Sequence, residues 1–155
     1  MPKTGVMIHR NKESCYNARI VVMRFMLDTN TCIYIAKKKP IEVLHRFEKL
    51  TIGQVGMSII TYGELLYGAY KSQNPKKTLI TIDELSGLIP PLPIPIEAGD
   101  HYGQIRHALE KTGKPIGGND LWIAAHALAL SMVLVTNNIK EFRRIPHLKL
   151  ENWVE

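Results

Sequence analysis

Short apolar runs alternate with longer amphipathic segments along this chain, and this alternation constrains the fold more than any other feature. The runs predicted as strands are 24–28, 55–60, 92–96, 133–136 and 148–153. The segments predicted as helices are 31–36, 41–50, 61–71, 76–88, 97–111 and 120–130, the last with Asn119 as its N-cap. Alternating strands and helices imply right-handed crossovers and a mainly parallel sheet. Because four prolines lie between residues 90 and 95, the strand 92–96 is expected at a sheet edge.

The chain length of 155 residues, with 45% hydrophobic residues, fits one globular domain. Residues 1–22 lack a repeating apolar face, so we expect a flexible N-terminal extension followed by a domain at 23–155. The two cysteines, Cys15 and Cys32, match no disulfide framework or metal spacing, and we expect free thiols. No apolar run approaches the ~20 residues of a membrane span, and no signal peptide is recognisable. These features predict a cytoplasmic protein.

Carboxylates follow the predicted strands where parallel α/β sheets form their sites. Asp28 ends the first strand, Glu64 lies in the helix after the second, and Asp120 begins a helix that is apolar nearly all round. Each acid alone could simply complement a helix dipole, a contribution of about 0.3–1 kcal/mol. Three acids beside buried elements repel one another unless a cation joins them. Because all the ligands are oxygens, Mg²⁺ or Mn²⁺ is the expected ion.

Seven motifs occur in one order from residue 23 to the end of the chain, and together they are specific. They lie at 25–30, 61–65, 103–106, 118–126, 135–138, 141–142 and 151–153. This ordered set resembles the PIN-domain ribonucleases, specifically the VapC-type toxins of bacterial toxin–antitoxin pairs. The resemblance implies a three-layer α/β/α fold with a twisted, mainly parallel sheet of four to five strands.

The resemblance also implies a site. Three residues match the core carboxylates of the family: Asp28, Glu64 and Asp120. The resemblance implies that they are catalytic residues and metal ligands. Asn138 stands at the fourth position, which is often acidic in the family, and Glu141 could supply the missing acid. Asn30 and Thr136 are expected to orient these carboxylates through hydrogen bonds.

The implied activity is metal-assisted hydrolysis of phosphodiester bonds in RNA, which would inhibit translation. The expected substrate is a tRNA anticodon stem-loop, with initiator tRNA indicated by the subgroup that the chain resembles most. The expected partners are a VapB-type antitoxin, which enters a groove near the acids, and a second copy of the chain. Net charge is +6, and contacts with RNA or antitoxin are expected from Arg106, Lys37, Lys38 and Lys39.

Two other interpretations remain open at this point. An aspartate-based phosphoryl-transfer domain also places an acid where Asp28 lies, but the phosphatase pattern has a second acid where this chain has Asn30. A non-catalytic RNA- or protein-binding module with a decayed site is supported only by Asn138. His126 is expected to be structural, and the aromatic residues Trp122, Tyr67 and Tyr70 are expected in the core or at interfaces.

Overall fold

The computed structural model describes residues 21–155; the first twenty residues of the predicted extension, with Cys15, lie outside the described part. The elements are β1 (Phe25–Leu27), α1 (Thr29–Lys37), α2 (Ile41–Glu48), β2 (Val55–Ser58), α3 (Ile59–Tyr70), α4 (Pro75–Leu88), β3 (Pro91–Leu92), α5 (Ala98–Lys111), α6 (Gly118–Ala129), β4 (Val133–Val135), α7 (Ile139–Phe142) and β5 (Leu150–Glu151). Within residues 21–155, no helix combines the length and apolar character needed to cross a membrane.

The five strands form one parallel sheet in the order β3-β2-β1-β4-β5. Met26 in the central strand β1 pairs with Gly56 of β2 on one side and with Leu134 of β4 on the other. Because the strands are parallel, their carboxyl ends meet at the same edge. The predicted α/β class and strand number are confirmed, and β3 lies at an edge as expected.

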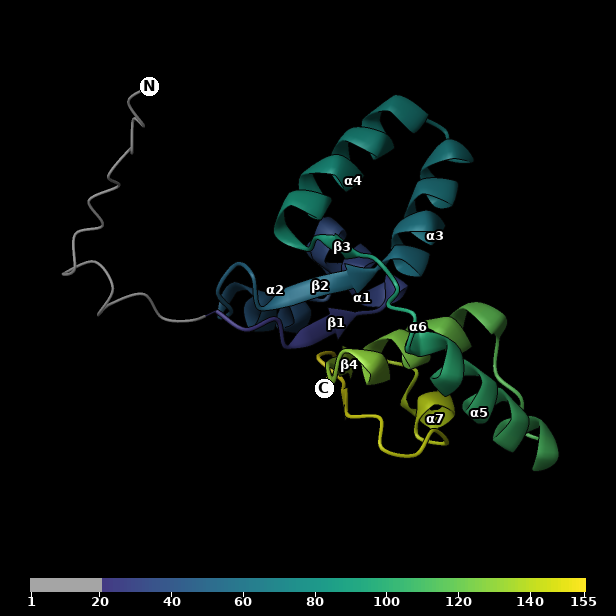
Figure 1. Ribbon diagram of the computed structural model, residues 1–155. Coiled ribbons are helices and arrows are strands. Elements are labelled where there is room, and N and C mark those ends of the chain that lie inside the picture. Colours follow the sequence, from purple (N-terminus) through teal and green to yellow (C-terminus); the bar gives the residue numbers. More distant parts are fainter. Residues whose placement is uncertain (1–20) are drawn as a thin grey trace, which may run out of the picture.

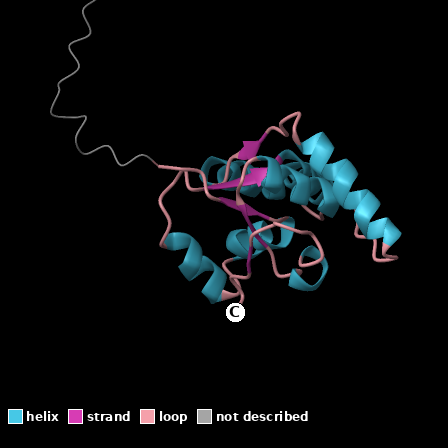
Figure 2. Ribbon diagram, turned by 60° about the horizontal axis from the view of Figure 1, so that its bottom comes forward, coloured by secondary structure: helices cyan, strands magenta, loops and turns pink. Residues whose placement is uncertain are grey.

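Side chains of β1 alternate between the two faces of the sheet, and each face has its own core. Phe25 and Leu27 pack with residues of α1–α4, whereas Met26 packs with residues of α5, α6 and α7. In Figure 1, α3 and α4 form a pair on one side of the strands, and α5, α6 and α7 lie on the opposite side. Figure 2 shows helices on both sides of the strands. The expected three-layer α/β/α arrangement is confirmed.

Helix starts differ from two of the sequence predictions. The N-cap of α6 is Gly117, whose carbonyl accepts a hydrogen bond from Leu121 N–H at 2.9 Å, so Asn119 lies inside the helix. Strand β2 ends at Ser58 because the Ser58 hydroxyl accepts a hydrogen bond from Ile60 N–H and caps α3. The predicted strand 55–60 is therefore too long by two residues.

Other differences concern short elements and aromatic side chains. Strand β3 comprises only Pro91–Leu92, so it shares a single residue with the predicted strand 92–96. The one-turn helix α7 has no counterpart among the predicted elements. Tyr67 and Tyr70 are 66% and 67% exposed, so of the two expected places, core or interface, the core is excluded and an interface stays a prediction. Trp122 is half-buried and stacks on Tyr102, with ring centroids 4.0 Å apart.

Candidate active site

Asp28 is fixed at the junction of β1, α1 and β4. It is the N-cap of α1, and its Oδ1 accepts a hydrogen bond from Thr31 N–H at 2.9 Å. Its own backbone N–H donates to the Val135 carbonyl at 3.0 Å, and the Thr31 hydroxyl donates to the same carbonyl at 3.3 Å. Asp28 is only 7% exposed. The carboxylate is therefore held rigidly at the carboxyl end of the central strand.

Glu64 lies in the second turn of α3 and is tied to the start of α1. The Thr29 hydroxyl donates a hydrogen bond to Glu64 Oε1 at 3.0 Å. Because Thr29 follows Asp28 directly, this bond brings α3 and its carboxylate to the residue next to Asp28. Thr29 and Thr31 were not among the predicted site residues; the usable signal was Asp28 itself, a preferred N-cap residue that accepts a backbone N–H two or three residues further on.

Asp120, in the first turn of α6, carries the clearest electrostatic signature of the site. Its pKa is raised from 3.8 to about 6, first by burial and then by the negative charges of Glu141, Glu64 and Asp28, in that order. Because interactions between charges fall off with distance and solvent screening, this effect requires the four acids to lie near one another. The fold thus gathers at one edge of the sheet acids that are up to 113 residues apart in sequence.

Asn138 and Glu141 form a pair beside these carboxylates. Asn138 Nδ2 donates a hydrogen bond to Glu141 Oε2 at 2.9 Å across α7. The buried Thr136 accepts the Asn138 backbone N–H at 3.0 Å, so it positions the start of α7 rather than a carboxylate. Asn30 is exposed and forms no hydrogen bond to an acid within the described residues. Of the neighbouring negative charges that raise the pKa of Asp120, that of Glu141 is the largest, which makes Glu141 a candidate for the fourth acidic position.

The donor chemistry of this site fits a hard divalent cation. Four carboxylates with no thiolate among them are the ligands that Mg²⁺ and Mn²⁺ prefer, and a cation would relieve the repulsion that raises the pKa of Asp120. In the described part of the chain, however, no three His, Cys, Asp or Glu side chains are arranged to hold a metal ion together. That Asp28, Glu64 and Asp120 share one ion therefore stays a prediction.

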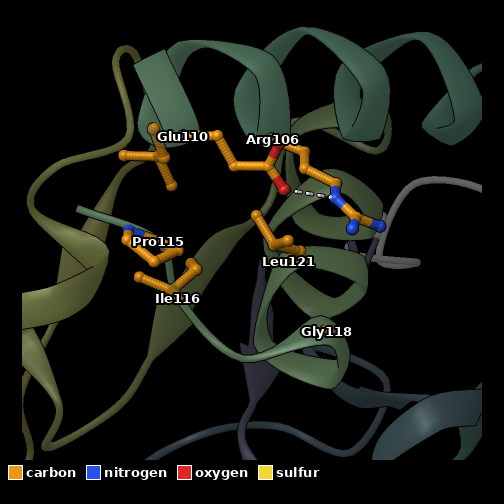
Figure 3. A pocket seen from close by; sticks show the side chains of 7 residues that line it. Arg106, Glu110, Pro115, Ile116, Gly118 and Leu121 are labelled. Atoms are coloured by element: carbon orange, nitrogen blue, oxygen red, sulfur yellow. Dashed lines mark hydrogen bonds and ion pairs between the residues drawn. The ribbon is translucent and has the colours of Figure 1, made fainter. Parts of the chain in front are cut away.

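Arg106 on α5 is directed toward partners on its own helix. Its Nε donates to Glu110 Oε1 at 2.8 Å and its Nη1 to the Tyr102 hydroxyl at 2.9 Å. Figure 3 shows this pair above a small hollow of about 240 Å³, which Pro115 and Leu121 also line. None of the four site acids lines this hollow.

A larger apolar groove of about 530 Å³ runs between α1, α3 and α4. Thr29 and Glu64 line it together with a floor of apolar and small side chains: Ile33, Ala36, Leu65, Gly68, Ala69, Ile82 and Leu85. Lys37 and Lys77 also line the groove, whereas Lys38 and Lys39 are exposed and do not line it. The groove therefore includes one of the candidate catalytic acids in its wall.

Comparisons with known proteins agree with this fold. The family model described as PIN domain matches residues 25–148. Ribonuclease VapC2 of Haemophilus influenzae is 41% identical over 133 residues, 86% of this chain and 100% of that protein. The tRNA(fMet)-specific endonuclease VapC of Salmonella typhimurium is 42% identical over 132 residues, 85% of this chain and 99% of that protein.

A solved structure extends this likeness to three dimensions. VapBC-1 from nontypeable Haemophilus influenzae contains a chain that superposes with a TM-score of 0.80 at 42% identity, covering 86% of this chain and 100% of that chain. The fold and the matching family model define a PIN-domain protein. Together with the relatives, they show that the chain belongs to the VapC ribonucleases of that family.

Proposed function

We propose that this protein is a divalent-metal-dependent endoribonuclease and the toxin of a toxin–antitoxin pair. The observation that carries the proposal is the electrostatic coupling of Asp120 to Asp28, Glu64 and Glu141 at the carboxyl edge of a parallel sheet. Such a concentration of negative charge is unfavourable on its own, and it is typical of sites that hold Mg²⁺ or Mn²⁺ for phosphodiester hydrolysis.

Each residue has a role that follows from its contacts. Asp28 and Asp120 would hold the ion, which when bound activates water and neutralises charge on the phosphate. Thr31 fixes the Asp28 carboxylate through its backbone N–H, and Thr29 fixes that of Glu64. Glu64 completes the negative cluster or orients the attacking water.

We assign the fourth acidic position to Glu141 rather than to Asn138. The carboxylate of Glu141 is the largest single-charge contribution to the raised pKa of Asp120. Asn138 supports it by donating its amide N–H to Glu141 Oε2 at 2.9 Å. An amide adds no negative charge, whereas Glu141 brings the cluster to four carboxylates.

The proposed substrate is tRNA, cleaved in the anticodon stem-loop with initiator tRNA as the first candidate, so that translation is inhibited. The name of the Salmonella relative, a tRNA(fMet)-specific endonuclease, supports this choice. Lys37, Lys38 and Lys39 stay candidates for contacts with RNA or with an antitoxin.

The proposed partners are a VapB-type antitoxin and a second copy of the chain, in a cytoplasmic complex. The apolar groove between α1, α3 and α4 suits an amphipathic antitoxin segment, and a basic side chain from it would meet Glu64. The exposed Tyr67 and Tyr70 on α3 favour a self-association surface. The solved structure of VapBC-1 supports a toxin–antitoxin complex.

Cleavage of unfractionated bacterial tRNA by the purified full chain tests the function. We expect cleavage with Mg²⁺ or Mn²⁺, none in EDTA, and at least a 100-fold loss in Asp28→Ala and Asp120→Asn, because removing one charged group that acts in the transition state costs about this much. Sequencing of the RNA ends identifies the cleaved bond. Cleavage that persists in EDTA would contradict the metal assignment, and equal rates in Asp28→Ala would contradict the site.

A further inference from the structure

A second hollow, of about 610 Å³, is formed by residues of and around α7 and by the C-terminal segment. It is lined by Asn137, Ile139, Arg143, Leu150, Asn152 and Glu155. These residues follow β4 or belong to β5 and the segment after it, so the hollow opens at the same edge of the sheet as the acids. Its volume is within the usual range for pockets that bind small ligands.

Helix α7 contributes residues both to this hollow and to the group of acids. Ile139 and Arg143 are four residues apart and therefore share one side of the helical turn. Glu141, two residues from each, lies on another side, where it accepts the hydrogen bond from Asn138. A helix with its side chains is about 10–12 Å across. An RNA strand bound at the acids would therefore pass along α7 to reach the hollow.

Arg143 supplies the positive charge in the hollow. Its side chain is exposed, and within residues 21–155 its guanidinium has no hydrogen-bond or ion-pair partner. Two other arginines are engaged: Arg46 forms an ion pair with Glu151 at 3.1 Å, and Arg106 forms one with Glu110 at 2.8 Å. An unengaged guanidinium is well suited to a phosphate, which it can bind through two parallel hydrogen bonds.

The other lining residues have the chemistry of a nucleoside site. Asn137 donates one amide hydrogen to the Tyr34 hydroxyl at 2.9 Å, and its side-chain carbonyl oxygen is available as an acceptor. Asn152 accepts a hydrogen bond from Val154 N–H through Oδ1, and its side-chain amide hydrogens are available as donors. The hollow therefore offers both an acceptor and donors, which the edge of an unpaired base requires, beside the partly buried apolar side chains of Ile139 and Leu150.

We propose that this hollow binds a nucleotide of the RNA substrate next to the one that is cleaved, with Arg143 on its phosphate and Asn137 and Asn152 at its base. The proposal rests on the proposed ribonuclease function. The hollow would determine which unpaired nucleotide is accepted beside the scissile bond. Glu155 is the one acid in the lining, and it weakens the attraction for phosphate.

Binding of a fluorescein-labelled single-stranded RNA decamer in EDTA, measured by anisotropy at several salt concentrations, tests the assignment. We expect Arg143→Ala to weaken binding about tenfold, because a hydrogen bond to a charged group is lost. The slope of log affinity against log salt should fall by about 0.7, the value for one phosphate contact on a single strand. Glu155→Gln should change affinity in the opposite direction.

Lys149→Ala is the matched control, because Lys149 is an exposed cation next to Leu150 but lines a different hollow with Ser131 and His147. We expect its affinity and salt slope to be those of the wild type. An Arg143→Ala variant with unchanged affinity and slope, or a Lys149→Ala variant with the same loss, would overturn the proposal.

Cleavage of unfractionated tRNA separates this proposal from the proposed function. Arg143→Ala should raise KM about tenfold and leave kcat within about twofold, because the lost contact lies away from the reacting atoms. If the wild type cleaves RNA and Arg143→Ala has an unchanged KM, the hollow is not a substrate site. If the wild type cleaves no RNA, the ribonuclease function fails, whatever the binding data show.

Discussion

Thr29 and Thr31 determine where two carboxylates of the site point. Thr29 donates its hydroxyl to Glu64, and Thr31 donates its backbone N–H to Asp28. We expect Thr29→Val to release Glu64 and to lower activity 10- to 100-fold, the usual effect of losing a hydrogen bond to a metal-site ligand. Thr29→Ser, which keeps the hydroxyl, should retain activity. Both can be measured as tRNA cleavage rates with Mn²⁺; equal rates for the two variants would contradict this role.

Asp120 should make the metal-free protein less stable at neutral pH. Its pKa in the fold, about 6, lies above its ordinary value of 3.8, so the folded state binds this proton more tightly than the unfolded state. Stability therefore falls as pH rises from about 4 to 6 and stays lower above that range. We expect Asp120→Asn to raise the free energy of unfolding at pH 7 in EDTA by about 1–2 kcal/mol, after allowance for solvent screening.

Urea unfolding of both proteins at pH 4 and pH 7 measures this effect. The gain should be much smaller at pH 4, where Asp120 is largely protonated in the wild-type fold. Asp83→Asn, an exposed change on α4, is the control and should alter stability little at either pH. A loss of stability in Asp120→Asn at pH 7 would be the opposite of what mutual repulsion requires.

The residues of the site were only partly predictable from the sequence. Asp28, Glu64 and Asp120 could be selected because each follows or begins a buried element. The sequence alone does not decide whether Asn138 or Glu141 takes the fourth position of the site, because the placement of the two side chains depends on a hydrogen bond across one helical turn. No pattern of apolar residues encodes that bond.

At the scale of elements, short structures escaped prediction for a physical reason. Helix α7 has four residues, about one turn, so it cannot display the repeating apolar face by which helices are recognised. The start of α3 was misplaced because Ile59 and Ile60 are β-branched like the strand before them, whereas the Ser58 cap decides the boundary. The longer helices were predicted within a few residues of their observed bounds.

Helix α3 offers a direct test of the groove. Gly68 lines the groove, and a Cβ added there meets nothing within 4 Å. We expect Gly68→Leu to fold with equal or higher stability, because leucine favours a helix interior over glycine by about 0.5–1 kcal/mol. The larger side chain should block the groove and weaken binding at least tenfold for a VapB-type antitoxin that binds the wild type, measured by calorimetry.

Gly87→Leu is the matched control on α4, because Gly87 is exposed, has the same open surroundings and does not line the groove. It should bind the antitoxin as the wild type does. Unchanged binding by Gly68→Leu would show that the antitoxin uses another surface.

At the scale of the whole molecule, a buried hydrogen bond links the two helical layers. His126 of α6 lies 2.9 Å from the Ser58 hydroxyl at the start of α3 and is fully buried, so its predicted structural role is confirmed. Burial lowers its pKa from the ordinary value of 6.5. The unfolded chain then binds this proton more readily, and stability is lost as pH falls below about 6.5, by at most ~1.4 kcal/mol per pH unit.

Thermal unfolding between pH 7 and pH 5 should therefore depend less on pH in His126→Gln than in the wild type. Ser58→Ala, which keeps the imidazole, should lower stability but retain the pH dependence. An unchanged pH dependence in His126→Gln would exclude this imidazole as its cause.

Asp28 forms its backbone hydrogen bond to Val135 between the central strand β1 and its neighbour β4, next to both cores. Its amide hydrogen should consequently exchange with deuterium only when the entire domain opens, at the rate of the slowest-exchanging core amides. A partly melted yet folded form with a dismantled site is then not accessible to this protein. An antitoxin of the proposed kind would then act by covering the Asp28 carboxylate rather than by displacing it.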